Sequence, residues 1–321
     1  MSDLLKLTNV TVQYKLEDRV LTALNNVSLV IPHSNYSIGV IGESGSGKTT
    51  LGMSIMNAIP QPGKIIEGDI QYDGQNVLKM NDTQLRGYRW EKVSMVYQSA
   101  MNSLNPVKKS IDHLIEVILE HQKVSKREAK EKSIQLLSSM GLKAEQMDGY
   151  AHELSGGMRQ RVVIAMALTL SPRILIADEP TSALDVVTQK QILALLSREI
   201  SKNDLSLVFI THEISLLNGL VEYVIVMYAG EIFERGPLKR ILSEPLHPYT
   251  EALLGTILTF NSNLSMVSSA MGVVRELGQL PSSNFCVYAN RCKYVFDRCT
   301  KEKPRLREAG VDRWVACHKY N

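Results

Sequence analysis

One stretch, residues 42–49, limits most strongly how this chain can fold. Its sequence, Gly-Glu-Ser-Gly-Ser-Gly-Lys-Thr, fits the pattern G-x-x-x-x-G-K-[ST] of a phosphate-binding loop. Residues 36–41 before it are apolar and β-branched enough for a buried strand, and residues 50–58 after it are typical of a helix. Because a phosphate-binding loop joins a strand to a helix, this context favours the motif over a Gly- and Ser-rich turn that matches by chance.

The chemistry of such a loop assigns roles to its residues. Its glycines let backbone N–H groups turn toward phosphate oxygens, and the following helix N-terminus adds a favourable dipole. Lys48 is expected to reach the β- and γ-phosphates of a nucleotide, and Thr49 to place its hydroxyl on Mg²⁺. The candidate nucleotide-binding residues here are Gly42, Ser44, Gly45, Ser46, Gly47, Lys48, Thr49 and Thr50.

The bulk composition narrows the function class. A length of 321 residues suggests one large domain with a smaller appendage, and 44% apolar residues suffice for a sizeable core. A net charge of +3 is too small to indicate a nucleic-acid partner. No apolar run follows a basic start, so we expect no secretory signal. The longest apolar runs, residues 162–170 and 220–229, fall short of the roughly 20 residues of a membrane span.

The first half of the chain changes from strands to helices. Alternating and apolar runs predict strands, with Asp73-Gly74 as a turn signal, at residues 4–13, 26–31, 36–41 and 65–77. We interpret this opening as an antiparallel patch beside a parallel sheet. A short strand over 93–97 precedes Gln98, and apolar residues then recur at helical spacing over 110–142. Residues 99–150 are therefore predicted to form a mainly helical insertion.

The second half alternates strands with helices. Ser155 is a good N-cap for a helix over 158–170. The remaining predicted elements are strands at 174–179, 206–211 and 223–228 and a helix at 187–200. Such alternation predicts a parallel sheet with right-handed crossovers.

Four polar residues or loops each follow a predicted strand directly. They are Gly42, Gln98, the Asp178-Glu179 pair and His212. In open α/β sheets the ligand site lies beyond the carboxyl ends of the strands. Asp178 suits Mg²⁺, and Glu179 could then polarise an attacking water, although an acidic strand end that stabilises a turn is the plain alternative.

With all motifs in order, the chain resembles the ATP-binding subunits of ABC transporters over nearly its whole length. The matching motifs are the loop 42–49, Val96-Tyr97-Gln98, Leu154-Ser155-Gly156-Gly157-Met158-Arg159-Gln160, Ile174–Glu179, Ser182-Ala183-Leu184-Asp185 and His212. The resemblance implies an α/β fold of the ABC-type P-loop NTPase, with a mainly parallel sheet, an N-terminal antiparallel β patch and a helical subdomain. We expect an ATPase domain at 1–257, containing the helical subdomain at about 99–160, and a small cysteine-rich extension at 258–321.

The resemblance also implies roles at matching positions. The catalytic residues would be Glu179, His212, Gln98 and Lys48, with Mg²⁺ at Thr49, Gln98 and Asp178 and adenine stacked on Tyr14. For Tyr14 and His212 the alternatives are an ordinary strand aromatic and a capped strand-end histidine. Ser155, Gly156 and Gly157 would offer N–H groups to the γ-phosphate held by a second subunit, and Asp185 would orient groups across that seam.

The partners implied are those of a transport machine. They are a second ABC ATPase subunit, either a copy or a paralogue, two transmembrane permease subunits and an extracytoplasmic substrate-binding protein. The protein would then lie peripherally on the cytoplasmic face of the cell membrane. Residues 103–106, 152–153, 246–250 and 252–254 resemble oligopeptide and dipeptide importer ATPases, whereas Ser99-Ala100 and Ala151 depart from the usual pattern.

Three alternative functions stay open. The first is a soluble ABC ATPase acting on nucleic acid or ribosomes, against which stand the single cassette and the small net charge. The second is an importer of another solute, such as a sugar or nickel. The third is an iron–sulfur redox sensor with a degenerate cassette, although no catalytic position is missing.

All four cysteines fall after residue 285, at Cys286, Cys292, Cys299 and Cys317. Zinc sites usually contain a tight C-x2–4-C pair, which is absent, and disulfides would be odd in a nucleotide-using protein. Loosely spaced thiolates suit a [4Fe–4S] cluster, which similar importer ATPases carry, although Lys293 stands where proline is usual. We expect a [4Fe–4S] cluster on these four residues, with buried free thiols as the alternative.

Overall fold

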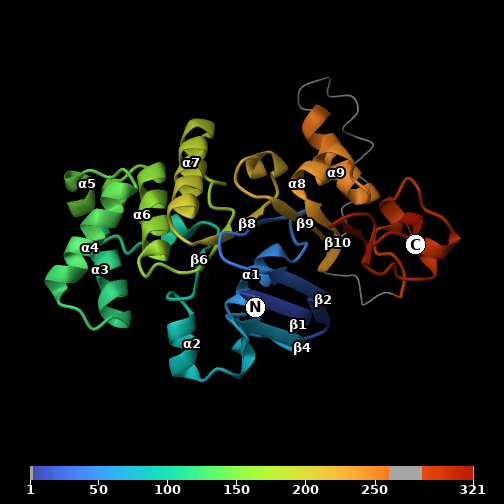
Figure 1. Ribbon diagram of the computed structural model, residues 1–321, viewed down its shortest axis with the longest axis horizontal. Helices are drawn as coiled ribbons and strands as arrows, with labels where there is room; N and C mark the ends of the chain where they lie inside the picture. Colours follow the sequence, from blue (N-terminus) through green and yellow to red (C-terminus); the bar gives the residue numbers. More distant parts are fainter. Residues whose placement is uncertain (1–2, 260–283, 321) are drawn as a thin grey trace. The chain divides into compact units, whose positions relative to one another are not determined.

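The computed structural model describes residues 3–259 and 284–320 (Figure 1). The chain divides into two compact units. The first contains Met1–Pro32, Ser37–Leu78 and Ile210–Asn321, and the second contains His33–Tyr36 and Lys79–Phe209. In the part of the chain that is described, no helix combines the length and the apolar character needed to cross a bilayer.

An antiparallel sheet opens the first unit, in agreement with the predicted strand-rich start. Its spatial order is β2-β1-β4-β5. The strands are β1 (Leu5–Lys15), β2 (Val20–Ile31), β4 (Gly63–Tyr72) and β5 (Gln75–Asn76). Asp73 and Gly74, between β4 and β5, have φ values of 48° and 78°. Positive φ at both central residues is what a type I′ hairpin turn requires, so the predicted turn is confirmed.

The phosphate-binding loop belongs to a second sheet of the same unit. Strand β3 (Ser37–Ile41) is buried throughout and pairs in parallel with β9 (Tyr223–Tyr228), which is also buried throughout. Their continuous apolar runs suit strands covered on both faces. Strand β10 (Glu231–Pro237) pairs with β9 in antiparallel orientation. The helices described in this unit are α1 (Lys48–Ile55), α8 (Leu238–Ser243) and α9 (Pro248–Thr259).

The described part of the C-terminal extension joins this second sheet. Strand β12 (Trp314–Val315) pairs with β10, and β11 (Arg307–Glu308) pairs with β12. Sequence patterns did not predict these strands, because two residues are too few to show alternation. The expected boundary between residues 257 and 258 falls within α9 and stays a prediction.

A buried ion pair fixes the extension to β10. Arg313 Nη2 lies 3.0 Å from Glu234 Oε1, and the side chains of the two residues are 6% and 0% exposed. The Glu234 carboxylate also accepts the N–H groups of Leu246 and His247, each at 2.9 Å. These hydrogen bonds satisfy a charge that would otherwise be costly to bury.

The second unit combines parallel strands with most of the helices. Strand β6 (Val93–Val96) pairs in parallel with β7 (Ile174–Asp178), and the chain returns to the first unit within β8 (Ser206–Thr211). The helices are α2 (Asp82–Tyr88), α3 (Ser110–His121), α4 (Lys126–Ser139), α5 (Ala144–Asp148), α6 (Gly156–Leu168) and α7 (Val186–Lys202). Short 3₁₀ segments occur in the described parts of both units. They are Val77–Lys79, Ala100–Ser103, Ala151–Glu153, Ile214–Leu217, Ala289–Arg291, Asp297–Thr300 and His318–Tyr320.

The predicted helical insertion is confirmed, and its helices carry clear end signals. Ser125 Oγ accepts the Glu128 N–H at 3.2 Å while the Glu128 carboxylate accepts the Ser125 N–H at 2.7 Å. This reciprocal capping box starts α4. Gly141, predicted to end the helical run, has a φ of 81°, the left-handed conformation that commonly follows a helix C-terminus.

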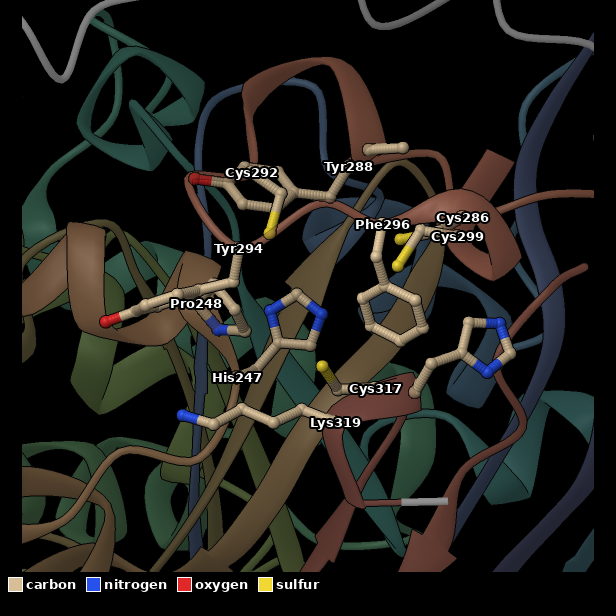
Figure 2. A pocket seen from close by; sticks show the side chains of 12 residues that line it. His247, Pro248, Cys286, Tyr288, Cys292, Tyr294, Phe296, Cys299, Cys317 and Lys319 are labelled. Atoms are coloured by element: carbon tan, nitrogen blue, oxygen red, sulfur yellow. The ribbon is translucent and has the colours of Figure 1, made fainter. Parts of the chain in front are cut away.

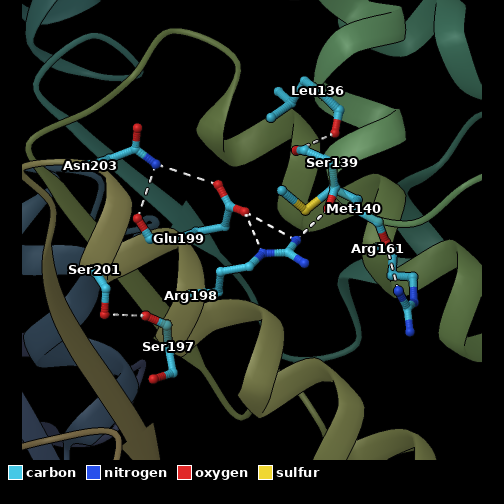
Figure 3. A network of polar contacts seen from close by, with 9 residues as sticks. All are labelled: Leu136, Ser139, Met140, Arg161, Ser197, Arg198, Glu199, Ser201 and Asn203. Atoms are coloured by element: carbon cyan, nitrogen blue, oxygen red, sulfur yellow. Dashed lines mark hydrogen bonds and ion pairs between the residues drawn. The ribbon is translucent and has the colours of Figure 1, made fainter.

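Two arginines from neighbouring helices close the end of α4 (Figure 3). Arg161 of α6 donates to the Met140 carbonyl at 2.6 Å, and Arg198 of α7 donates to the Ser139 carbonyl. Arg198 is also paired with Glu199 at 3.2 Å. Cations at a helix C-terminus satisfy its free carbonyls, so these contacts tie α6 and α7 to the end of α4.

Candidate functional site

The predicted phosphate-binding loop connects β3 to α1. Gly45 and Gly47 have φ values of 77° and 97°, which side chains with a Cβ rarely adopt. A Cβ on Gly42 would lie 2.2 Å from the Met227 carbonyl oxygen, and one on Gly47 would lie 2.5 Å from the Ala23 carbonyl oxygen. The glycines are therefore required by close backbone neighbours as well as by the turns themselves.

Lys48 spans this loop from the first turn of α1. Its Nζ atom donates to the carbonyl oxygens of Gly42 at 2.9 Å and Glu43 at 2.8 Å, and it lies 3.4 Å from Ser46 Oγ. The side chain is buried. This arrangement keeps a positive charge at the loop that is expected to receive phosphate.

The N-terminus of α1 has no side-chain cap. Gly47 occupies the N-cap position, and the first turn contains no acidic residue. The first N–H groups of a helix lack partners within the helix, and its dipole favours an anion there. Thr49 and Thr50 lie half-buried in this turn, whereas Ser44 and Gly45 are exposed. The turn therefore offers amide and hydroxyl groups to a negatively charged ligand.

In the second unit, parallel pairing of β6 and β7 brings two predicted site residues together. Val96 is paired with Ala177, so Gln98 and Glu179 follow the same ends of neighbouring strands. Gln98 Nε2 donates to Glu179 Oε2 at 3.1 Å. Asp178, the last residue of β7, is 1% exposed. The two carboxylates thus differ in setting, one enclosed and the other half-buried at the strand end.

Glu179 also adopts an unusual backbone conformation. Its φ of 46° is in the left-handed region, which is uncommon for residues other than glycine and asparagine. Such conformations cost free energy and are concentrated at functional sites. The observed strain therefore supports a functional interpretation of Glu179, although its catalytic role stays a prediction.

The predicted signature segment begins α6. Ser155 is the N-cap, and its hydroxyl accepts the Met158 N–H at 3.3 Å, as its sequence position predicts. A Cβ on Gly157 would lie 2.5 Å from Thr188 Cγ2 on α7. Gly156 and Gly157 are the first two residues of the helix. Their amides are therefore at the end of a helix where an anion is favoured.

Asp185 has a clear local role at the start of α7. Its carboxylate accepts the N–H groups of Val187 and Thr188 at 3.0 Å and the Thr188 hydroxyl at 2.6 Å. The Thr188 hydroxyl and amide hold the pKa of Asp185 below its usual value. Asp185 is thus an N-cap, and its expected role across a subunit seam stays a prediction.

Two further predicted residues lie in the first unit. Tyr14, on β1, is half-buried, and its ring lies over Gly63, where a Cβ would be 2.5 Å from Tyr14 Cε1. His212 follows β8 with a side chain 52% exposed, and its Nε2 atom is 3.8 Å from Glu213 Oε1. The expected parts of Tyr14 and His212 in nucleotide binding stay predictions.

Comparison with known proteins decides the family. The ABC transporter family matches residues 24–182, and the "Oligopeptide/dipeptide transporter, C-terminal region" matches residues 233–299. The dipeptide transport ATP-binding protein DppD of Escherichia coli (strain K12) is 37% identical over 98% of this chain and 96% of its own. The oligopeptide transport ATP-binding protein AppD of Bacillus subtilis (strain 168) is 36% identical over 100% of this chain and 98% of its own. The chain belongs to the family of ABC transporter ATP-binding proteins.

Solved structures agree with this assignment. The ATP-binding cassette MJ0796, in a dimeric post-hydrolysis state with ADP and Pi, is 30% identical, with a TM-score of 0.65 over 73% of this chain and 98% of its own. The predicted ABC-type α/β fold is thereby confirmed, and the chain is an ABC-type ATPase. The similarity to DppD and AppD covers 98% and 100% of this chain and therefore includes the C-terminal extension. The similarity to MJ0796, by contrast, covers only 73% of this chain.

The prediction of a [4Fe–4S] cluster in this ABC ATPase is wrong. The four cysteines line one small cavity together with aromatic and basic side chains (Figure 2). Within residues 3–259 and 284–320, however, no group of three or more His, Cys, Asp or Glu side chains is placed to hold a metal ion. The names of the relatives above describe ATP-binding transport proteins and mention no cluster.

The state of the thiols gives a physical reason for this correction. Cys286 and Cys299 are buried and Cys292 and Cys317 half-buried, and all four are free. Burial raises the pKa of Cys286 to about 12 and raises the pKa of Cys292 and Cys317 as well. Iron ligation requires thiolates, and burial disfavours the thiolate form of Cys286, Cys292 and Cys317. The four cysteines are free thiols, two buried and two half-buried, which is the alternative that the sequence left open.

Proposed function

We propose that this chain is the ATP-hydrolysing subunit of an importer for oligopeptides or dipeptides. One observation carries the proposal: the similarity to dipeptide and oligopeptide transport ATP-binding proteins covers 98–100% of this chain, including the C-terminal region at residues 233–299.

ATP and Mg²⁺ would be bound by the residues already described. Loop amides and Lys48 would take up charge on the phosphates, Thr49 and Asp178 would hold Mg²⁺, and Tyr14 would stack on adenine. Glu179 would polarise the attacking water, with Gln98 beside it sensing both water and metal. His212 would contact the γ-phosphate. The hydrogen bond from Gln98 to Glu179 supports this division of roles, since it keeps the proposed base oriented.

A second ATPase subunit would complete each site. This chain has one phosphate-binding loop and one signature segment, Ser155–Gly157, whose amides suit the γ-phosphate on the other subunit. MJ0796 is dimeric in the structure cited above, which supports the same arrangement. Two transmembrane permease subunits and an extracytoplasmic substrate-binding protein would form the rest of the importer, with this chain on the cytoplasmic face of the membrane.

Uptake by cells tests the proposal. The source cells would carry either the natural chain or Lys48→Ala, and uptake of labelled dialanine, labelled tetraalanine, nickel and a labelled sugar would be measured. We expect loss of uptake of at least one peptide, with nickel and sugar uptake unchanged. Unchanged peptide uptake together with loss of nickel or sugar uptake would contradict the peptide class.

A further inference from the structure

Glu43, the second residue of the phosphate-binding loop, has its polar groups fixed by three different parts of the first unit. Its N–H donates to Tyr249 Oη at 2.8 Å, and its carbonyl oxygen accepts from Lys48 Nζ at 2.8 Å. Its carboxylate forms two hydrogen bonds with Arg291, each 2.9 Å long. Lys48 belongs to the loop motif itself, but Tyr249 and Arg291 lie more than 200 residues further along the chain.

Arg291 is held in place on its other side by aromatic rings. Its Nη1 atom donates to Tyr228 Oη at 3.2 Å, and its guanidinium carbon lies 5.7 Å from the ring centroids of Tyr228 and Tyr288. The pair is partly screened, because the Arg291 and Glu43 side chains are 19% and 30% exposed. A bidentate contact of this kind fixes direction as well as distance.

Tyr249 is anchored even more firmly. It is 1% exposed, and its ring lies 4.8 Å from that of Tyr228 and 5.5 Å from that of Tyr288. The Tyr249 N–H donates to His247 Nδ1 at 3.0 Å. Burial raises the pKa of Tyr249, so its hydroxyl stays neutral and can accept the Glu43 N–H. Both partners of Glu43 therefore belong to one packed aromatic cluster.

The carboxylate of Glu43 poses an electrostatic problem for the loop. A nucleoside triphosphate is strongly negative, and a free carboxylate on Glu43, directly after Gly42 and two residues before Gly45, would repel it. Arg291 cancels that charge, while Tyr249 and Lys48 hold the peptide groups on either side of Glu43. Binding of phosphate by backbone amides depends on their preset orientation, so fixing this residue favours nucleotide binding.

We propose that Arg291 and Tyr249 are positioning residues for the nucleotide site, through which the C-terminal region sets the affinity of the phosphate-binding loop for ATP. The inference rests on nucleotide binding by the loop, as proposed above. Neither residue contacts the reacting atoms; both act through Glu43.

A double-mutant cycle tests whether Arg291 acts by neutralising the charge of Glu43. The MgATP dissociation constant would be measured by calorimetry for the full chain and for Arg291→Gln, Glu43→Gln and the double variant. We expect Arg291→Gln to weaken binding roughly tenfold, within the range known for residues that act through a neighbour. In the Glu43→Gln background the same change should have less than about a twofold effect, because no charge is left to neutralise.

Salt and a matched control separate this role from a general loss of structure. Repulsion by an unpaired Glu43 is screened by salt, so the effect of Arg291→Gln should shrink between 0.05 and 0.5 M NaCl. Lys293→Ala is the matched control, two residues after Arg291 in the sequence. It removes an exposed ion pair with Glu251 and should leave the MgATP dissociation constant unchanged. An equal loss in both Glu43 backgrounds, or none in either, would overturn the proposal.

Two further variants keep the test decisive. Tyr249→Phe keeps the ring and removes only the acceptor of the Glu43 N–H, so ATP binding should weaken several-fold even where Arg291 variants fail to fold. Unchanged affinity in Tyr249→Phe would overturn its positioning role. Lys48→Ala serves as the reference variant. If Lys48→Ala binds ATP as tightly as the natural chain, the proposed nucleotide site is wrong. If Lys48→Ala weakens ATP binding but the Arg291 and Tyr249 variants do not, only the positioning role of Arg291 and Tyr249 is refuted.

Discussion

At the scale of single residues, the ends of β6 and β7 hold the groups proposed for catalysis. Gln98 and Glu179 are 3.1 Å apart, and Glu179 has a strained backbone with a φ of 46°. The Gln98 amide donates to one oxygen of the Glu179 carboxylate and so orients it at the end of β7. A general base must be held within hydrogen-bond reach of the water whose proton it takes, and this contact fixes its direction.

Replacing Glu179 by Gln tests this assignment. The amide keeps the size of the side chain and can still contact Gln98, but it cannot accept a proton. We expect ATP turnover to fall at least about 100-fold, with MgATP affinity kept or increased. Phosphate release in single-turnover and steady-state assays measures the effect, and Gln135→Glu, at an exposed position of α4, provides a surface control. Turnover within a few-fold of the natural chain would refute Glu179 as the base.

The sequence could predict these positions because their chemistry is local. A glycine pattern with Lys48, or two carboxylates at the end of an apolar run, is visible without knowing the fold. The contact between Gln98 and Glu179 depends in addition on which strands are neighbours. It forms because β6 and β7 pair in parallel, which places the residues that follow them side by side. The state of the cysteines could not be predicted in this way, because their spacing in the sequence indicates neither the arrangement of the thiols nor their protonation.

At the scale of elements, the C-terminal extension is held by side chains that no short motif reveals. The buried pair of Arg313 and Glu234 joins the segment before β12 to strand β10. Arg235 lies 4.4 Å from the Trp314 ring, again across the same two strands. These contacts join residues roughly 80 positions apart, so they depend on tertiary pairing rather than on local pattern.

Arg313→Met should destabilise this attachment strongly. It leaves the fully buried Glu234 carboxylate without its cation, at a cost of about 3–5 kcal/mol. Urea unfolding followed by Trp314 fluorescence, in a Trp90→Phe background, reports on the extension directly. Arg298→Ala removes an exposed pair with Glu302 and should barely change the free energy of unfolding. A similar loss of unfolding free energy in both variants would contradict the proposed contribution of the buried pair to stability.

The buried histidine of the aromatic cluster predicts a pH dependence. Burial lowers the pKa of His247 to about 3, against about 6.5 in an unfolded chain. The unfolded state therefore binds an extra proton between these values, so the stability is complete above pH 6.5 and decreases as the pH falls. At pH 5 the loss from His247 alone is about 2 kcal/mol.

His247→Asn isolates that contribution, because Asn Oδ1 can still accept the Tyr249 N–H but does not titrate. The free energy of unfolding would be measured at pH 7 and pH 5 by urea titration. The natural chain should lose about 2 kcal/mol more than the variant on going to pH 5. Equal losses would show that His247 does not stay neutral in the folded protein.

Most longer elements were predictable, and the shortest were not. The helices of residues 110–142 show apolar spacing and end signals such as Ser125 and Gly141, which act within a few residues. Strand β2 begins at Val20 rather than at the predicted residue 26, because its first part is held by pairing with β1. Strands β11 and β12 have two residues each and form only because β10 offers a partner edge.

At the scale of the whole molecule, the chain is one ABC ATPase cassette with an attached C-terminal region. Each of the two units contains part of the motif set: the phosphate-binding loop lies in the first, and the signature segment and Glu179 lie in the second. One copy of each motif per chain is the reason to expect that hydrolysis needs a second cassette. The sequence predicted this count directly, whereas the identity of the second cassette lies outside any single chain.

The dependence of turnover on a second cassette tests this central claim most directly. ATP turnover per chain would be measured over a wide range of protein concentration, alone and with a paralogous cassette from the same cells, with sedimentation recording the fraction of dimer. Turnover should rise with the dimer fraction and be negligible where the chain is monomeric. Full turnover, independent of concentration, by a chain that sediments as a monomer would contradict a site completed by a second subunit.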